Sequence, residues 1–165
     1  QRTAFALAAA YGNVLVSRTC SKAYGLAAER IGWMTGAPQL IDLVNRLRGA
    51  FNVTSIGQAA AVAAVGDQNF VDASRAHNAV ELARFEARIA ALGNRGLRCM
   101  PSRANFSLVL FEGALTAADA LAGLAARGYA VRHLPSQGLG HALRITIGAR
   151  EDMDAIADAL AEMAG

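Results

Sequence analysis

The chain has 165 residues, of which 54% are hydrophobic and 18% are charged, and its formal net charge at pH 7 is +3. This length can bury a proper core, and the composition excludes a disordered chain. The arginines alternate with Asp and Glu and form no basic run, so we expect no nucleic-acid partner. No apolar run reaches the roughly 18 residues of a membrane span, and no signal-peptide pattern opens the sequence. We therefore expect a cytoplasmic protein without a membrane partner.

The cysteines and histidines are too scattered to predict a metal site or a structural disulfide. Cys20 and Cys99 form no C-x-x-C pair and have no histidine at ligand spacing. The three histidines, His77, His133 and His141, are also far apart along the chain. We expect no bound metal.

The first part of the chain predicts strands that alternate with helices, as in an α/β protein. Alternation and β-branched residues at 13–19 indicate a strand that leads into the segment around Lys22. After it we expect a loop with a short turn of helix at 21–30, a short buried strand at 31–35, a helix at 39–48 that follows Pro38, and a buried helix of small residues at 55–65.

A long helix is predicted from Asp67 to about residue 92, because Asp67 can cap its start and Gly93 with Asn94 can end it. A helix of this length suits a connection between two lobes. Beyond it we expect short strands at 97–100, 105–111, 129–132 and 143–147, with helices at 116–127 and 151–163. These elements predict a small lobe of the α+β class.

Lys22 is the only lysine among the sixteen Lys and Arg residues of the chain. A lysine amine can lose its proton when it is buried or near other cations, and it can then bond to an aldehyde, whereas a guanidinium cannot. Composition alone leaves two explanations open: a codon bias with one stray lysine, or a position that needs an amine.

The surrounding residues favour a position that needs an amine. Segment 19–33 reads TCSKAYGLAAERIGW, with hydroxyl groups at Thr19 and Ser21 and a cation at Arg30. The hydroxyls can donate to phosphate oxygens, and the guanidinium can bind two of these oxygens at once. An aldehyde whose phosphate is anchored in this way would keep its carbonyl carbon against the Lys22 amine.

This segment resembles the cofactor-lysine motif of the fold-type I aminotransferases, and in particular of the histidinol-phosphate aminotransferase family, T-x-S-K-[AS]-[FY]-G-L-A-G-x-R-x-G. Further segments resemble that family in the same order: F-N-V-T-S followed by Q-A-A within 51–60, P-S-R-A-N-F at 101–106, V-R at 131–132 and L-R-I-T-I-G at 143–148. Each match alone is weak, but their common order makes a chance resemblance improbable.

The resemblance implies a fold-type I α/β transferase with pyridoxal 5'-phosphate as its cofactor. It implies that Lys22 carries the cofactor and later acts as the base that moves the substrate's α-proton. It also implies that Thr19, Ser21 and Arg30 anchor the cofactor phosphate. One departure concerns Ala28-Glu29, which stands where the family commonly has Gly and an apolar residue. An acid at position 29 could compete with phosphate for the neighbouring guanidinium.

For the substrates, the resemblance implies that Arg144 binds the carboxylate of glutamate or 2-oxoglutarate and that Arg132 holds the phosphate of histidinol phosphate. Taken out of context, both would be ordinary surface arginines beside a strand. Asn105 could orient a substrate, and a polar residue that caps a strand end explains it equally well. Two substrates that share one site would be clamped by the same cations, since either a carboxylate or a phosphate can bind them.

By the same resemblance the chain corresponds to the C-terminal half of a longer enzyme, because the family's Asp for the pyridine nitrogen lies further before the lysine than Gln1 does. We expect the end of the large domain at 1–66, the connecting helix at 67–95 and the small α+β domain at 96–165. The intact family enzyme is a homodimer with its active site between the lobes and at the dimer interface.

The resulting hypothesis is an aminotransferase of histidine biosynthesis, which converts histidinol phosphate and 2-oxoglutarate to imidazole acetol phosphate and glutamate. Alternatives within the same chemistry are an aromatic aminotransferase and a threonine-phosphate decarboxylase. A hypothesis of another class is a catalytically silent fragment that serves as a packing or dimerisation module.

Overall fold

The structure is a computed structural model that describes residues 3–165. The chain forms two compact units that divide between Ser74 and Arg75. We call the part up to Ser74 unit 1 and the part from Arg75 unit 2, and each is described by itself. No helix among the described residues is both long and apolar enough to cross a membrane.

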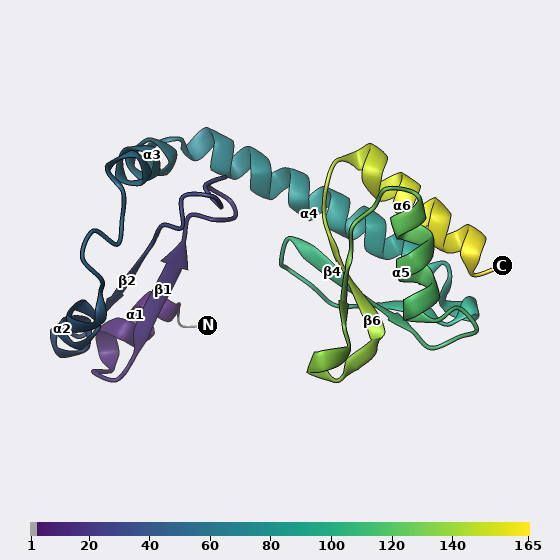
Figure 1. Cartoon of the computed structure of the whole chain (residues 1–165), viewed down its shortest axis with the longest axis horizontal. Helices are drawn as coiled ribbons and strands as arrows, with labels where there is room; N and C mark the ends of the chain where they lie inside the picture. Colours follow the sequence, from purple (N-terminus) through teal and green to yellow (C-terminus); the bar gives the residue numbers. More distant parts are fainter. Residues whose placement is uncertain (1–2) are drawn as a thin grey trace. The chain divides into compact units, whose positions relative to one another are not determined.

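Unit 1 contains a two-stranded antiparallel sheet (Figure 1). β1 (Leu15–Thr19) pairs with β2 (Gly32–Gly36), with Thr19 opposite Gly32. The strands approach so closely that a Cβ on Gly32 would lie 2.5 Å from the Arg18 carbonyl oxygen. The helices of this part of the chain are α1 (Ala4–Ala10), α2 (Pro38–Leu47), α3 (Ser55–Gly66) and the start of α4 (Gln68–Ala90).

Most predicted elements of unit 1 are confirmed to within two residues, namely the strands at 13–19 and 31–35 and the helix at 39–48. Pro38 occupies the first turn of α2, where its missing N–H costs no hydrogen bond. Residues 21–30 form successive turns and bends instead of the expected turn of helix. α1 has no counterpart among the expected elements, because its run AFALAAA has no polar face that would mark an amphipathic helix.

The expectation that the helix at 55–65 is buried is wrong. Gly57 is its one buried residue, whereas Ile56 and Val62 are 74% and 77% exposed. Small apolar residues suit a buried helix, but burial also requires a second surface, and the described part of the chain supplies none at these positions. The helix begins as a capped helix should, because the Thr54 hydroxyl accepts a hydrogen bond from the Gly57 N–H at 2.9 Å.

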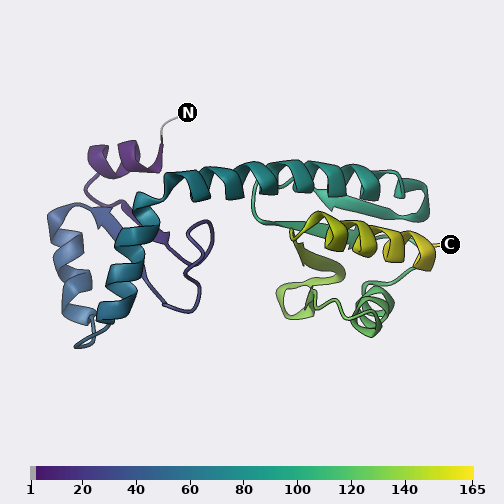
Figure 2. The same ribbon diagram turned by 90° about the horizontal axis from the view of Figure 1, so that it is seen from above.

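Unit 2 is a four-stranded antiparallel sheet with helices packed on one face (Figures 1 and 2). The strand order is β3 (Leu97–Met100), β4 (Phe106–Phe111), β6 (Leu139–Thr146) and β5 (Arg132–Leu134). α5 (Ala117–Ala126), α6 (Arg150–Met163) and the larger part of α4 supply the helical layer, and the single-turn helices η1 (Gly93–Arg95) and η2 (Pro135–Gln137) lie in connections. In Figure 2, α6 runs beside α4.

The two faces of this sheet differ in chemistry because side chains alternate along a strand. The face toward the helices is apolar: Val109, Leu143 and Ile145 are fully buried in one cluster with helix residues such as Ile89 and Leu160. The opposite face carries the alternate positions of the same strands. We call it the open face, and its residues in the site below are Phe106, Leu108, Arg132 and Arg144.

In unit 2 the strand at 97–100 and the helices at 116–127 and 151–163 are confirmed. The long helix begins in unit 1, after an Asp67 carboxylate that accepts the Phe70 N–H. The strand expected at 129–132 is wrong in position, since β5 starts at Arg132. The preceding residues turn the chain instead: Gly128 has a φ of 87°, and the Tyr129 N–H donates back to the last turn of α5. β6 is longer than expected and starts at Leu139.

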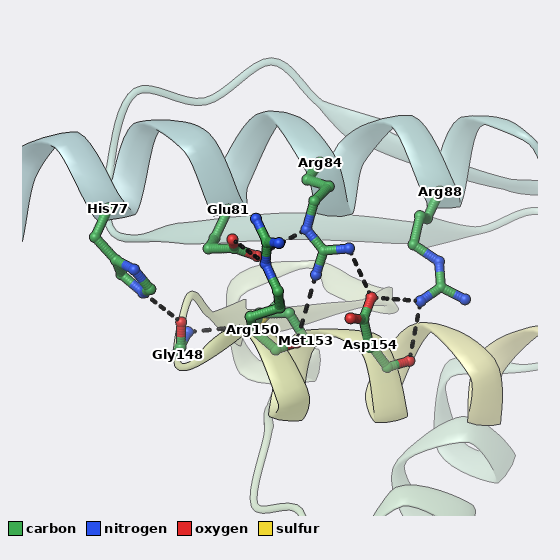
Figure 3. Close-up of polar contacts among 8 residues, drawn as sticks. All are labelled: His77, Glu81, Arg84, Arg88, Gly148, Arg150, Met153 and Asp154. Carbon is green, nitrogen blue, oxygen red and sulfur yellow. Dashed lines mark hydrogen bonds and ion pairs between the residues drawn. The ribbon is translucent and has the colours of Figure 1, made fainter.

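Charged side chains hold α6 against α4 (Figure 3). Glu81 is 2% exposed and accepts hydrogen bonds from Arg84 at 2.9 Å and from Arg150 at 3.1 Å. Asp154 accepts from Arg84 at 2.8 Å and from Arg88 at 2.7 Å. A buried carboxylate is tolerated only with such partners, because an unpaired buried charge is very costly. The network therefore fixes the position of α6 on the long helix.

Burial alone would raise the pKa of Glu81, but hydrogen bonds from Arg84 and Arg150 outweigh it and hold that pKa below the ordinary 4.5. A hydrogen bond from Arg84 likewise lowers the pKa of Asp154, and it outweighs the opposing effect of burial. Each of these carboxylates has a lower pKa in the folded than in the unfolded chain. Such a group stabilises the fold at a pH above its unfolded pKa. This stabilisation is lost as the pH falls through its folded pKa.

We therefore expect the melting temperature, followed by circular dichroism, to fall as the pH is lowered from about 7 to about 3. Glu81→Gln should start from a lower melting temperature and fall less steeply, because one proton-linked group is gone. Asp42→Asn is the matched control, since Asp42 forms an exposed pair with Arg46 on α2. If the melting temperature depended on pH equally steeply in wild type and in Glu81→Gln, the role of Glu81 would be contradicted.

Candidate functional site

Lys22 lies in the loop that joins β1 to β2. The loop is closed by backbone hydrogen bonds from Cys20 to the Ile31 carbonyl at 3.0 Å and from Leu26 to the Cys20 carbonyl at 2.9 Å. A further bond joins the Gly25 N–H to the Lys22 carbonyl at 2.8 Å, and Gly25 has a φ of 71°, which glycine adopts readily. The Lys22 side chain is exposed, and no hydrogen bond or ion pair to its amine is found among residues 3–165.

The predicted phosphate anchors lie together at the base of this loop. The Thr19 hydroxyl donates to Ser21 Oγ at 2.9 Å and accepts from the Ser21 N–H at 3.1 Å. Arg30 Nη1 donates to Ser21 Oγ at 3.4 Å and to the Ala27 carbonyl at 2.8 Å. Arg30 has a φ of 52°, which is unusual for a residue with a side chain and is common where function imposes strain. Two hydroxyls and a guanidinium thus converge in the loop that carries Lys22.

This donor set fits a phosphate monoester. Guanidinium groups bind phosphate oxygens in pairs, hydroxyls donate to them, and the Arg30 bond to Ser21 Oγ is long enough to give way to a stronger acceptor. A neighbouring free amine fits the aldehyde of pyridoxal phosphate. These groups are consistent with the cofactor that the sequence predicts, and their individual roles stay predictions.

Glu29 does not pair with Arg30, contrary to the competition expected from sequence. Its carboxylate lies instead against the first turn of α3, where a Cβ added to Gly57 would be 3.3 Å from Glu29 Oε2 and 3.0 Å from Thr54 Oγ1. Among the described residues Arg30 has no acidic partner, and its guanidinium stays directed at Ser21 and Ala27. The sequence contains no signal for this placement, because it depends on a contact between segments far apart in the chain.

The two predicted substrate arginines are direct cross-strand neighbours on the open face. Arg132 of β5 and Arg144 of β6 are paired in register, and Leu108 of β4 lies on the other side of Arg144. Like charges opposite each other destabilise a sheet, and neither arginine has an acidic partner within the described chain. Such a pair is stabilised when an anion binds between its members.

Arg144 carries a second sign of an absent partner. Its Nε is buried and has no hydrogen-bond acceptor in the described structure. Its guanidinium carbon lies 5.1 Å from the centre of the Phe106 ring, which holds the side chain by a cation–π contact. A buried unsatisfied donor costs free energy, and such groups are found at binding sites. Phe106 was not singled out as a site residue, although it ends the P-S-R-A-N-F segment.

Asn105 immediately precedes β4, and its carbonyl accepts a hydrogen bond from the Ile147 N–H at 3.0 Å. The side chain is exposed. The turn before it is held by other groups, since Ser102 Oγ donates to the Phe106 carbonyl at 2.7 Å and accepts from the Ala104 N–H. The backbone of Asn105 therefore has a structural role, and the amide side chain is available for the substrate contact that the sequence predicts.

Comparison with known proteins decides the family. The family model described as aminotransferase class I and II matches residues 2–160 of the chain. The chain belongs to this family. Histidinol-phosphate aminotransferases from Erythrobacter litoralis and Zymomonas mobilis are 68% and 53% identical to it over 160 residues, or 97% of the chain. The chain spans 44% and 43% of the length of these two relatives.

A solved structure places the fold in the same family. The histidinol-phosphate aminotransferase from Sinorhizobium meliloti, determined in complex with pyridoxal-5'-phosphate, superposes with a TM-score of 0.73 at 32% identity. The match covers 93% of this chain and 41% of that one. The predicted α/β fold of a fold-type I transferase is thereby confirmed.

If the two arginines repel each other, removing one of them should stabilise the chain in the absence of an anion. We expect Arg132→Gln to raise the midpoint of urea unfolding at low ionic strength. The corresponding gain in the free energy of unfolding should be at most about 1 kcal/mol. The gain should shrink in salt, because the repulsion is screened. Arg103→Gln, at an exposed arginine before β4, is the control. An unchanged or lower midpoint for Arg132→Gln at low salt would contradict the repulsion.

Proposed function

We propose that this chain is the part of a histidinol-phosphate aminotransferase that carries the cofactor lysine, the phosphate anchors and the substrate arginines. The reaction transfers the amino group of histidinol phosphate to 2-oxoglutarate and yields imidazole acetol phosphate and glutamate. The observation that carries the proposal is the convergence of Thr19, Ser21 and Arg30 in the loop that also carries Lys22, in a chain 68% identical over 160 residues to an enzyme of that name.

Lys22 would hold the cofactor and afterwards move a proton. Pyridoxal phosphate, when bound, supplies an aldehyde that bonds to amines and a ring that withdraws electrons from the substrate's α-carbon. The Lys22 amine, once free of the cofactor, would be the base that takes the α-proton of the substrate and moves it. Thr19, Ser21 and Arg30 would fix the phosphate end, so that the reacting carbon stays within reach of Lys22.

The open-face arginines would select the substrates. Arg144 would bind the carboxylate of 2-oxoglutarate or glutamate, with its buried Nε as one of the donors. Arg132, its neighbour across the strands, would bind the phosphate of histidinol phosphate. Because each substrate brings an anion, each would neutralise the charge repulsion of the pair. Asn105 would orient the substrate from the start of β4.

The proposed organisation of the intact protein follows the family. Residues 1–66 would complete a large domain, 67–95 would connect, and 96–165 would form the small α+β domain of a cytoplasmic homodimer. Its substrates would be small molecules. The large apolar side chains left exposed in unit 1 support this proposal, since Leu47 is 86% and Phe51 99% exposed. Apolar surface of this kind is typical of an interface.

The proposal is tested by the cofactor itself. Pyridoxal phosphate added to the intact protein that carries this sequence should produce a visible absorbance band, and borohydride should then fix the label on the peptide that contains Lys22. Lys22→Arg, which keeps the positive charge, should take up no label at this peptide. A label elsewhere, or an equal label on the Lys22→Arg protein, would contradict the role of Lys22.

Arg132→Ala tests the substrate. We expect kcat/KM for histidinol phosphate to fall by roughly a hundredfold, as for the loss of a charge-assisted contact. The value for an unphosphorylated aromatic amino acid should change little. Equal losses for both substrates would remove the support for histidinol phosphate and favour an aromatic aminotransferase or a general loss of folding, which the melting temperature separates.

A further inference from the structure

The further inference concerns how Arg30 is kept free for a phosphate. Glu29 directly precedes Arg30, and an acid in this position is the nearest possible partner for the guanidinium. The structure separates the two charges. Glu29 Oε2 and the Glu29 carbonyl oxygen lie 3.3 and 3.8 Å from the point where a Gly57 Cβ would be.

Gly57 leaves the carboxylate more room than a residue with a side chain would. Gly57 is the buried residue of α3, and its N–H is bonded to the Thr54 hydroxyl that caps the helix. The positive end of a helix dipole lies at this first turn and favours a carboxylate beside it. An alanine here would place a methyl group 3.0 Å from Thr54 Oγ1 and 3.3 Å from Glu29 Oε2, so a neighbour would have to move.

The conformation of Arg30 complements this arrangement. Its positive φ of 52° turns the chain sharply between residues 29 and 31, and its guanidinium donates to Ser21 Oγ and to the Ala27 carbonyl. Neither acceptor carries a charge, so a phosphate could displace them. A carboxylate in their place would be a stronger competitor.

We propose that the first turn of α3 sequesters the Glu29 carboxylate, and that Gly57 and Glu29 together act as positioning residues that leave the Arg30 guanidinium free for the phosphate of the cofactor. This inference rests on the proposed function, because it assigns residues that act through one of its phosphate anchors. It adds a segment, the start of α3, to which the motif around Lys22 does not extend.

A matched pair of variants tests the proposal in the intact protein that carries this sequence. Glu29→Asp shortens the side chain by one methylene, so its carboxylate would no longer reach α3 and could turn to Arg30. Glu29→Asn has the same size without the charge. We expect Glu29→Asp to raise the dissociation constant for pyridoxal phosphate about three- to fivefold, and Glu29→Asn to stay within twofold of wild type.

Pyridoxal, which lacks the phosphate, separates positioning from folding. Its dissociation constant, measured by equilibrium dialysis, should be the same for wild type and both variants. Gly57→Ala gives a second approach: it should weaken pyridoxal phosphate and not pyridoxal, and Glu29→Gln in the Gly57→Ala background should restore the affinity.

Three results would overturn the inference: equal affinities of the Asp and Asn variants for pyridoxal phosphate, a parallel loss for pyridoxal, or no restoration in the double variant. A wild-type protein that binds no pyridoxal phosphate would refute the proposed function itself, and the inference with it. If Gly57→Ala does not fold, the Asp and Asn pair alone decides.

Discussion

The pairing of β1 with β2 is the constraint on which the loop that carries Lys22 depends. Because Thr19 lies opposite Gly32, the chain between them must leave and return at the same point, and this brings Arg30 back to Ser21. The backbone bond from Cys20 to Ile31 extends the pairing by one step, and the buried side chain of Cys20 anchors the loop. Lys22 thus lies on a loop fixed by backbone bonds and a buried side chain, as the proposed role of holding a reacting atom requires.

The two faces of the sheet in unit 2 differ in stability: one carries a pair of like charges, and the other carries the apolar core. The open face carries two opposed arginines and a buried Nε without an acceptor, whereas the helical face carries the apolar core. A sheet can tolerate local repulsion when its other face is well packed, and such exceptions to local rules concentrate at functional sites. Alternate residues of the same strand can therefore serve the packed core and the proposed substrate contacts.

Much of the fold was predictable because its signals are local. Pro38 marks the start of α2 and Asp67 that of α4, as expected, and α5 lies within the expected helix at 116–127. The exposure of α3 was not predictable, because composition does not say what packs against a helix. Within the candidate site, the local motif named Thr19, Ser21 and Arg30. The pairing of Arg132 with Arg144 was not predictable, because it depends on strand register. The contact of Glu29 with α3 was not predictable either, because it depends on tertiary packing.

The order of strands in unit 2 has a consequence for biosynthesis. β6 lies between β4 and β5 and follows both along the chain, and α6, which follows β6, is held to α4 by pairs 66 to 70 residues apart in sequence. During synthesis, β3 and β4 precede β6, the strand that completes their sheet. Glu81 likewise has no Arg150 partner until the later residue has been synthesised. Unit 2 can therefore complete its sheet only after β6 has been synthesised, and until then the β4 edge has no partner strand.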